Sequence, residues 1–112
     1  MRFNKRFYQD EIEFFLETDK IEFDCLWNII KDAIRPTSFG DVEVTSWTES
    51  CSFMIDALEF YFEEFYAQEP PVFILRLLPF GKHCKSDVEK LKQIVELIEQ
   101  NEKFRIFLKS SG

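Results

Sequence analysis

An apolar run closed by prolines is the feature that most constrains the fold of this chain. Val72 to Leu78 follows Pro70 and Pro71 and ends at Pro79. A continuous apolar run of this length, with prolines at both ends, is typical of a central strand that is covered on both faces. We therefore expect a sheet with this strand in its interior.

The segment from Ser86 to Gln100 has the clearest helical pattern. Ser86 and Glu89 match a capping box, in which each side chain accepts a hydrogen bond from an otherwise unpaired amide at the helix start. The apolar stripe that recurs at helical spacing consists of Val88, Leu91, Ile94, Val95 and Ile98. Asn101 is a suitable residue to end the helix.

The N-terminal third holds a predicted helix and an ambiguous segment. Residues 20–34 have an apolar stripe at helical spacing, with Thr18 or Asp19 as the capping residue. Residues 2–17 fit a strand in their first part. Their second part fits a short helix or a strand equally well, so the structure of this segment stays undecided.

Residues 52–66 favour a third helix. Asp56, Glu59 and Glu63 recur at steps of three and four residues, which places them on one helical face. Met54, Leu58, Tyr61, Phe62 and Phe65 then lie on the other side of the helix. A strand needs a period of two, and the acidic residues interrupt that alternation.

Residues 41–47 and 104–108 alternate in the manner of strands. Together with the strand over 72–78, they give the order strand, helix, strand, helix, strand. Because such an order produces parallel neighbours, we predict a single α/β domain over residues 1–112. Its sheet would be small, three- to four-stranded and mostly parallel, with helices packed on it. The alternative is an α+β fold with an antiparallel pair, if residues 2–17 form a strand or hairpin.

Residues that carry catalysis or bind cofactors are sparse. Cys25, Cys51 and Cys84 contain no C-x-x-C pair, and His83, the one histidine, falls in a predicted loop. The three glycines are too few and too scattered for a phosphate-binding loop. The acidic residues of 52–66 have the oxygen ligands that magnesium or calcium prefers, but no calcium-loop motif accompanies them. We expect no enzyme, no cofactor and no metal.

The charge of the chain is unevenly distributed. The formal net charge is −7, which disfavours direct binding to nucleic acid or to an anionic membrane. Residues 36–75 contain no lysine or arginine. They contain eight acidic residues: Asp41, Glu43, Glu49, Asp56, Glu59, Glu63, Glu64 and Glu69.

This acidic segment has two interpretations. As a docking surface for a basic protein, its carboxylates would steer the encounter and its aromatic residues would anchor it. The predicted partner-binding residues are Asp41, Glu43, Trp47, Glu49, Asp56, Glu59, Tyr61, Glu63, Glu64 and Tyr66. As a solubility face, the segment would be neutralised on folding by bases such as Lys82, Lys85, Lys90 and Lys92.

From Ser52 onward the chain resembles the barstar-type inhibitors and, more broadly, the immunity proteins of bacterial toxin systems, including contact-dependent inhibition. The resembling parts are SFMIDALEFYFEEFY, PVFILRLL, SDVEKLKQIVELIEQ and FRIFL. The resemblance implies an antitoxin that occludes the active site of a basic toxin, commonly a nuclease. Asp56, Glu59 and Glu63 would then take the positions of substrate phosphates.

Two other functions are compatible with the same sequence. A phage or plasmid protein that mimics DNA would also be acidic, and would block a DNA-processing enzyme. A structural subunit would use surplus aromatic side chains, among 14 Phe, to form a homodimer or larger homo-oligomer. The chain has no apolar run long enough to span a membrane and no signal-peptide pattern, so we expect a cytoplasmic location.

Overall fold

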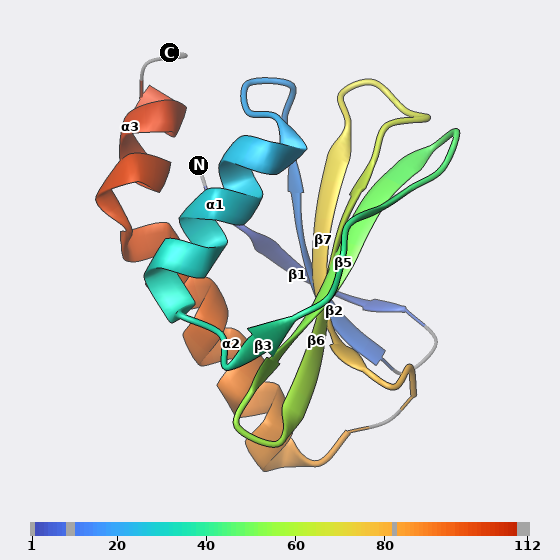
Figure 1. Cartoon of the computed structure of the whole chain (residues 1–112), viewed down its shortest axis with the longest axis vertical. Helices are drawn as coiled ribbons and strands as arrows, with labels where there is room; N and C mark the ends of the chain where they lie inside the picture. The colour runs from blue at the N-terminus through green and yellow to red at the C-terminus, as the bar shows by residue number, and fades with distance from the viewer. Residues whose placement is uncertain (1, 9–10, 82, 110–112) are drawn as a thin grey trace.

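The sheet is antiparallel throughout the described part of the chain, and the helices lie on one of its faces (Figure 1). The computed structural model describes residues 2–8, 11–81 and 83–109. The prediction of a small, mostly parallel α/β sheet is therefore wrong. The protein has an α+β fold, the class held as the alternative, but antiparallel pairing extends over the whole sheet.

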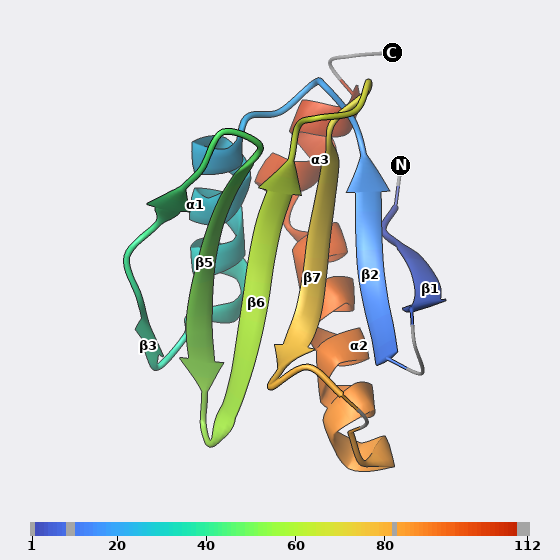
Figure 2. The same cartoon turned by 90° about the vertical axis from the view of Figure 1, so that its right-hand side faces the viewer.

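The sheet contains seven strands in the order β1-β2-β7-β6-β5-β3, with β4 also paired to β5 (Figure 2). The strands are β1 (Asn4–Tyr8), β2 (Glu11–Glu17), β3 (Ser38–Phe39), β4 (Glu43–Val44), β5 (Thr48–Ile55), β6 (Leu58–Phe65) and β7 (Val72–Leu78). The helices are α1 (Phe23–Ile34), α2 (Lys85–Gln100) and α3 (Glu102–Lys109).

The segment predicted as a helix over 52–66 is a β-hairpin formed by β5 and β6. Its buried residues alternate, with Phe53 on β5 opposite Phe60 on β6, and both rings lie in the core. The acidic spacing misled the prediction because a step of four residues fits both periods. Glu59 and Glu63 share a face on a strand as they would on a helix. Asp56 leaves the acidic row, because it lies in the turn between the strands.

The undecided N-terminal segment forms the hairpin of β1 and β2. Phe14 and Leu16 point from β2 into the core, and Phe3 is buried just before β1 begins. The amide N–H of Phe3 donates to Glu99 Oε2 of α2 at 2.8 Å, which ties the start of the chain to the helical layer.

Strand β7 lies inside the sheet between β2 and β6, as its apolar sequence predicted. Phe73, Leu75 and Leu77 face the helices and are buried. The expectation that both faces would be covered is wrong, because no helix of the described chain lies on the other face (Figure 1). Ile74 and Arg76 point to that uncovered side and are only partly buried.

The helices over 20–34 and 86–100 are confirmed, but their predicted caps are wrong. The N-cap of α1 is Glu22, and Thr18 Oγ1 instead accepts a hydrogen bond from the amide of Lys20 at 3.1 Å. The N-cap of α2 is Cys84, so Ser86 lies inside the helix and forms no capping box. Both helices are held by their apolar stripes against the sheet.

The predicted strand over 104–108 is instead the helix α3. Asn101 ends α2 as expected, and its side chain then starts the next helix. Asn101 Oδ1 accepts hydrogen bonds from the amides of Lys103 at 2.9 Å and Phe104 at 3.3 Å, which is the pattern of an N-cap. Phe104 is buried, so one turn of helix places its ring in the core.

The predicted strand over 41–47 is reduced to the two residues of β4. Pairing stops at Val44, and a tight turn leads into β5. Thr45 Oγ1 accepts hydrogen bonds from the amides of Trp47 and Thr48 at 3.2 and 3.0 Å. Gly40 separates β4 from β3, so this edge of the sheet consists of two short pieces.

The core between sheet and helices is built mainly from aromatic rings. Its largest fully buried side chains include Phe23, Phe53, Phe60, Phe62, Phe73 and Phe104. Phe62 stacks on Phe73 with ring centroids 5.9 Å apart and on Phe23 at 5.0 Å. Within the described residues, no helix has the length and apolar character needed to cross a membrane.

Candidate binding surface

The face of the sheet opposite the helices is the candidate binding surface, and we call it the open face. In an antiparallel sheet, residues paired directly across strands point to the same side. The register therefore defines the open face as Asn4, Arg6, Glu11, Glu13, Phe15, Glu17, Glu43, Thr48, Ser50, Ser52, Met54, Glu59, Tyr61, Glu63, Phe65, Val72, Ile74, Arg76 and Leu78.

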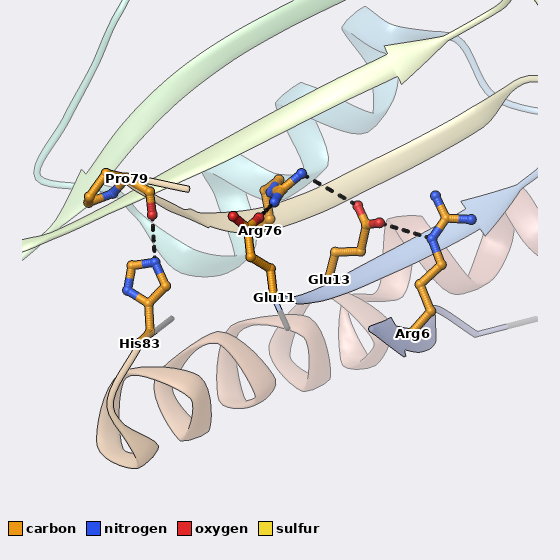
Figure 3. A network of polar contacts seen from close by, with 6 residues as sticks. All are labelled: Arg6, Glu11, Glu13, Arg76, Pro79 and His83. Carbon is orange, nitrogen blue, oxygen red and sulfur yellow. Dashed lines mark hydrogen bonds and ion pairs between the residues drawn. The ribbon is translucent and has the colours of Figure 1, made fainter. Parts of the chain in front are cut away.

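Both arginines of the open face are engaged by carboxylates of β2 (Figure 3). Arg76 forms an ion pair with Glu11 and approaches Glu13, with Nη1 3.9 Å from Glu13 Oε2. Arg6 Nε donates to Glu13 Oε1 at 3.0 Å. Glu13 is only 3% exposed, so its buried charge depends on these two guanidinium groups.

Each of these arginines also lies against a phenylalanine ring. The guanidinium carbon of Arg6 is 4.5 Å from the centroid of Phe15, and that of Arg76 is 4.2 Å from the centroid of Phe80. Phe80 follows β7 and meets Tyr61 edge-on, with centroids 5.9 Å apart and an interplanar angle of 90°. The centre of the open face is thus aromatic, and both of its guanidinium groups stack on phenylalanine rings.

Tyr61 connects this aromatic centre to the acidic side of the face. Its hydroxyl donates a 2.7 Å hydrogen bond to Glu63 Oε1. Burial raises the pKa of Tyr61 to about 12, a hydrogen bond with Ser50 opposes the rise, and the carboxylates of Glu63 and Glu43 add to it. At neutral pH the phenol is therefore a neutral donor that holds the Glu63 carboxylate in place.

Among the described residues, no ion pair joins the carboxylates of β4 and β6 on the open face to a base; Lys82 lies outside these residues. The ion pairs among the described residues join Arg6 and Arg76 to Glu11 and Glu13, on the β1–β2–β7 side. Glu43, Glu59 and Glu63 lie on the other side, around Tyr61. The open face carries six carboxylates against two guanidinium groups, and the excess is concentrated there.

The predicted partner-binding residues do not form one surface. Glu43, Glu59, Tyr61 and Glu63 lie on the open face. Asp41 is exposed between β3 and β4, and Asp56 is in the β5–β6 turn. Trp47 is exposed in the β4–β5 turn, and the Tyr66 hydroxyl donates to the backbone oxygens of Thr45 and Thr48 beside it.

Glu49 and Glu64 point to the helical side of the sheet and line a separate pocket. This pocket has a volume of about 380 Å³ and also includes Glu22 at the start of α1. Burial, followed by the carboxylates of Glu49 and Glu22, raises the pKa of Glu64, whereas a hydrogen bond from the backbone of Phe23 lowers it. Across the residues that the structure describes, no group of three or more metal-ligating side chains is placed to hold a metal ion.

Sequence reasoning missed Arg76, Phe80 and the acidic residues of β2. A signal was present, because Arg76 is the one charge inside an apolar strand. Such a charge usually has a buried partner or a function. Glu11 and Glu13 also alternate with apolar residues in the manner of a half-covered strand. Phe80 gave no signal, since its contacts come from a loop folding back over β7.

The cysteines and the histidine are dispersed. His83 Nε2 lies 2.6 Å from the backbone oxygen of Pro79 (Figure 3). Cys51 is buried in the core, and burial raises the pKa of its thiol to about 12 against a smaller opposing effect of Lys31. A thiol with so high a pKa is a poor nucleophile at neutral pH. Cys84, at the start of α2, contacts Ser86 Oγ at 3.2 Å.

Comparisons of the chain with protein-family models, with curated proteins and with solved structures found no match.

Proposed function

We propose that this protein is an acidic binding module that neutralises a basic toxin domain, in the manner of an immunity protein or antitoxin, in the cytoplasm. The contact surface is the open face. The observation that carries the proposal is the group of carboxylates on Glu43, Glu59 and Glu63 around Tyr61, for which the described chain supplies no base.

The charge of the open face favours a cationic partner over a second copy bound face to face. With six carboxylates and two guanidinium groups, two such faces would repel each other. Arg76 is committed to Glu11 and Glu13 of its own chain, so it is not placed to neutralise a second copy's β4–β6 side. A basic protein would instead be attracted to the excess carboxylates, and its binding would remove the repulsion among them.

The spacing of the carboxylates favours discrete basic side chains over a mimic of DNA. Glu59 and Glu63 are four residues apart on one strand, a separation of about 14 Å. Glu43 lies two strands from Glu63, or about 10 Å away. Each DNA strand carries a charge about every 3.4 Å of its axis, so this array is much sparser than a phosphate backbone. It fits two or three separate lysines or arginines of a protein partner.

The aromatic centre supplies the apolar part of such an interface. Tyr61, Phe65 and Phe80 are partly exposed beside the carboxylates. Aromatic residues at the middle of an interface carry much of the binding energy, whereas peripheral charges mainly accelerate association. A nuclease is the expected toxin, because an active site that binds nucleic-acid phosphates is basic.

The proposal is tested by co-expressing the chain with the protein encoded by the neighbouring gene and measuring binding and toxin inhibition. Glu59→Lys combined with Glu63→Lys should slow association at least about tenfold at low salt. The matched control is Glu89→Lys with Glu96→Lys, the same charge change on exposed positions of α2. Equal effects of the two double variants, or inhibition unaffected by either, would refute the open face as the contact surface.

A further inference from the structure

The two edges of the sheet are complementary to each other. At one end, β1 pairs only with β2, so its outer side is unoccupied within the described chain. At the other end, the short strands β3 and β4 line the outer side of β5. An unpaired edge presents a row of backbone donors and acceptors that can accept another strand.

The side chains at these edges match face by face. On the open face, Arg6 lies at the β1 edge and Glu43 at the β4 edge. On the helical face, Phe7 of β1 is 72% exposed and Val44 of β4 is 67% exposed. On the open face the two edges therefore offer charges of opposite sign. On the helical face both edges offer apolar side chains, and β1 also carries the exposed Lys5 there.

The strand directions permit the two edges to pair between copies. Every step from β1 through β2, β7, β6 and β5 to β4 is antiparallel. The path has five steps, so β1 and β4 run in opposite directions. A second copy in the same orientation, placed beside the first, would therefore bring its β1 antiparallel to β4, with all helices on one side.

We propose that the chain assembles head to tail through these edges, with β4 of one copy pairing with β1 of the next in one continuous sheet. The register sets Glu43 opposite Arg6, Val42 opposite Phe7 and Val44 opposite Lys5. Arg6 bonds Glu13 through Nε, and its side chain remains 44% exposed, so part of its guanidinium group is accessible to a neighbouring copy. Pairing between the β1 strands of two copies is disfavoured, because it would bring Lys5 and Arg6 of one copy close to those of the other.

This assembly is heterologous, since different surfaces of the two copies meet. Such a contact does not end at a dimer but extends into a chain or closes into a ring. The short length of β4 makes the contact weak, and the net charge of −7 on each copy opposes it at low salt. At 0.15 M salt, the Debye length of about 8 Å confines this repulsion to near contact. The assembly does not rest on the proposed antitoxin function, although both use Glu43, and its test involves no toxin.

The test is sedimentation velocity on the full chain between about 10 µM and 1 mM at 0.15 M salt, the range expected for a small contact. The average mass should rise with concentration past that of a dimer. Glu43→Lys places like charges opposite each other at the β4 edge. Phe7→Glu removes the apolar contact with Val42 and would place a carboxylate against that side chain. Each variant alone should remain monomeric, and both sites are exposed, so circular dichroism should match the unmodified protein.

A mixture of the two variants decides between modes of pairing. The Glu43→Lys chain keeps an intact β1 edge, and the Phe7→Glu chain keeps an intact β4 edge. Their equimolar mixture should form a one-to-one dimer and nothing larger. A protein that stays monomeric up to 1 mM overturns the proposal. So does a mixture that stays monomeric, or a wild-type assembly that ends at a dimer.

Discussion

The ring of Phe80 covers the guanidinium group of Arg76, with 4.2 Å between the guanidinium carbon and the ring centroid. Arg76 is at the same time ion-paired with Glu11 and close to Glu13. The one cation near the middle of the open face is therefore used within the protein. Its charge is directed at β2, away from Glu43 on the far side of the sheet. This arrangement explains how a face that contains two arginines presents a net acidic side.

Phe80→Leu should destabilise the fold slightly and change the open face more than the core. Phe80 is 57% exposed, so its contribution comes mainly from the ring over Arg76 and the edge contact with Tyr61. A partly exposed cation–π contact is worth about 0.5–1 kcal/mol. Urea unfolding should show a loss of that size. Ile106→Leu, at an exposed site on α3, is the control and should change the unfolding free energy by less than about 0.5 kcal/mol.

Arg76→Met should destabilise the protein strongly. The arginine side chain is 15% exposed, and its removal leaves the buried carboxylate of Glu13 with Arg6 as its one remaining ion-pair partner among the described residues. Removing one partner of a buried ion pair typically lowers the free energy of unfolding by about 3–5 kcal/mol. Denaturant unfolding should show a loss near the lower end, because Arg6 persists.

The double variant Arg76→Met with Glu13→Gln separates this electrostatic effect from lost packing. If the uncompensated charge is responsible, neutralising Glu13 should recover more than about 1 kcal/mol in a double-mutant cycle. Arg105→Met, on the exposed side of α3, is the matched control and should be nearly neutral. Additive effects of the two substitutions would contradict the role assigned to the ion pair.

Local patterns predicted the elements whose periodicity is unambiguous. The apolar stripe of residues 86–100 fits only a helix, and the proline-bounded run of residues 72–78 is too short for a helix. The structure confirms the helix and the strand. The hairpin of 52–66 was missed because Glu59 and Glu63 are four residues apart, and this step matches one face of a strand as well as one face of a helix. The alternation of 104–108 was overridden by Asn101, whose side chain starts a new helix.

The candidate surface was predicted in part, for a physical reason. Glu43, Glu59 and Glu63 were identified from the charge of their segment and Tyr61 as an aromatic residue among them. Strand register places all four on one face. Glu49 and Glu64 were placed with them, but residues one step away in a strand point to the opposite side. No local pattern could show that both arginines would be bound by β2, because those contacts depend on which strands become neighbours.

The phenol of Tyr61 should make stability depend on pH above about pH 10. Burial is the largest cause of its rise in pKa, from an ordinary value of 10.0 to about 12. Since the folded pKa lies above the unfolded one, Tyr61 contributes its full stability below pH 10. The contribution is lost as the pH rises toward 12, where the folded phenol also ionises. The difference in unfolding free energy between the wild type and Tyr61→Phe should therefore change between about pH 10 and about pH 12, with the wild type losing stability. A constant difference over that range would contradict the raised pKa.

Glu49→Gln should stabilise the protein at neutral pH. The pKa of Glu64 is raised first by burial and then by Glu49 and Glu22, so its ionised form is disfavoured in the fold. A raised folded pKa contributes stability at acidic pH that is lost as the pH rises. Removing the Glu49 charge should raise the free energy of unfolding by a few tenths of a kcal/mol at pH 7, since solvent screens this partly exposed pair. At pH 4 the increase should be close to zero. Glu89→Gln on α2 should not show this difference between the two pH values.

Asp56→Gly should stabilise the β5–β6 hairpin. Asp56 is the first residue of the two-residue turn between Ile55 and Leu58, and its φ of 55° lies in the left-handed region. A non-glycine residue is strained by about 1 kcal/mol in this conformation, although aspartate tolerates it better than most, and glycine is not strained. Thermal and urea unfolding should show a gain of about 0.5 kcal/mol.

The control is Ala57→Gly. Ala57 is the neighbouring turn residue and has no positive φ, so glycine at this position should lower stability through the greater freedom of the unfolded chain. Were both substitutions to lower stability equally, the turn conformation assigned to Asp56 would be wrong.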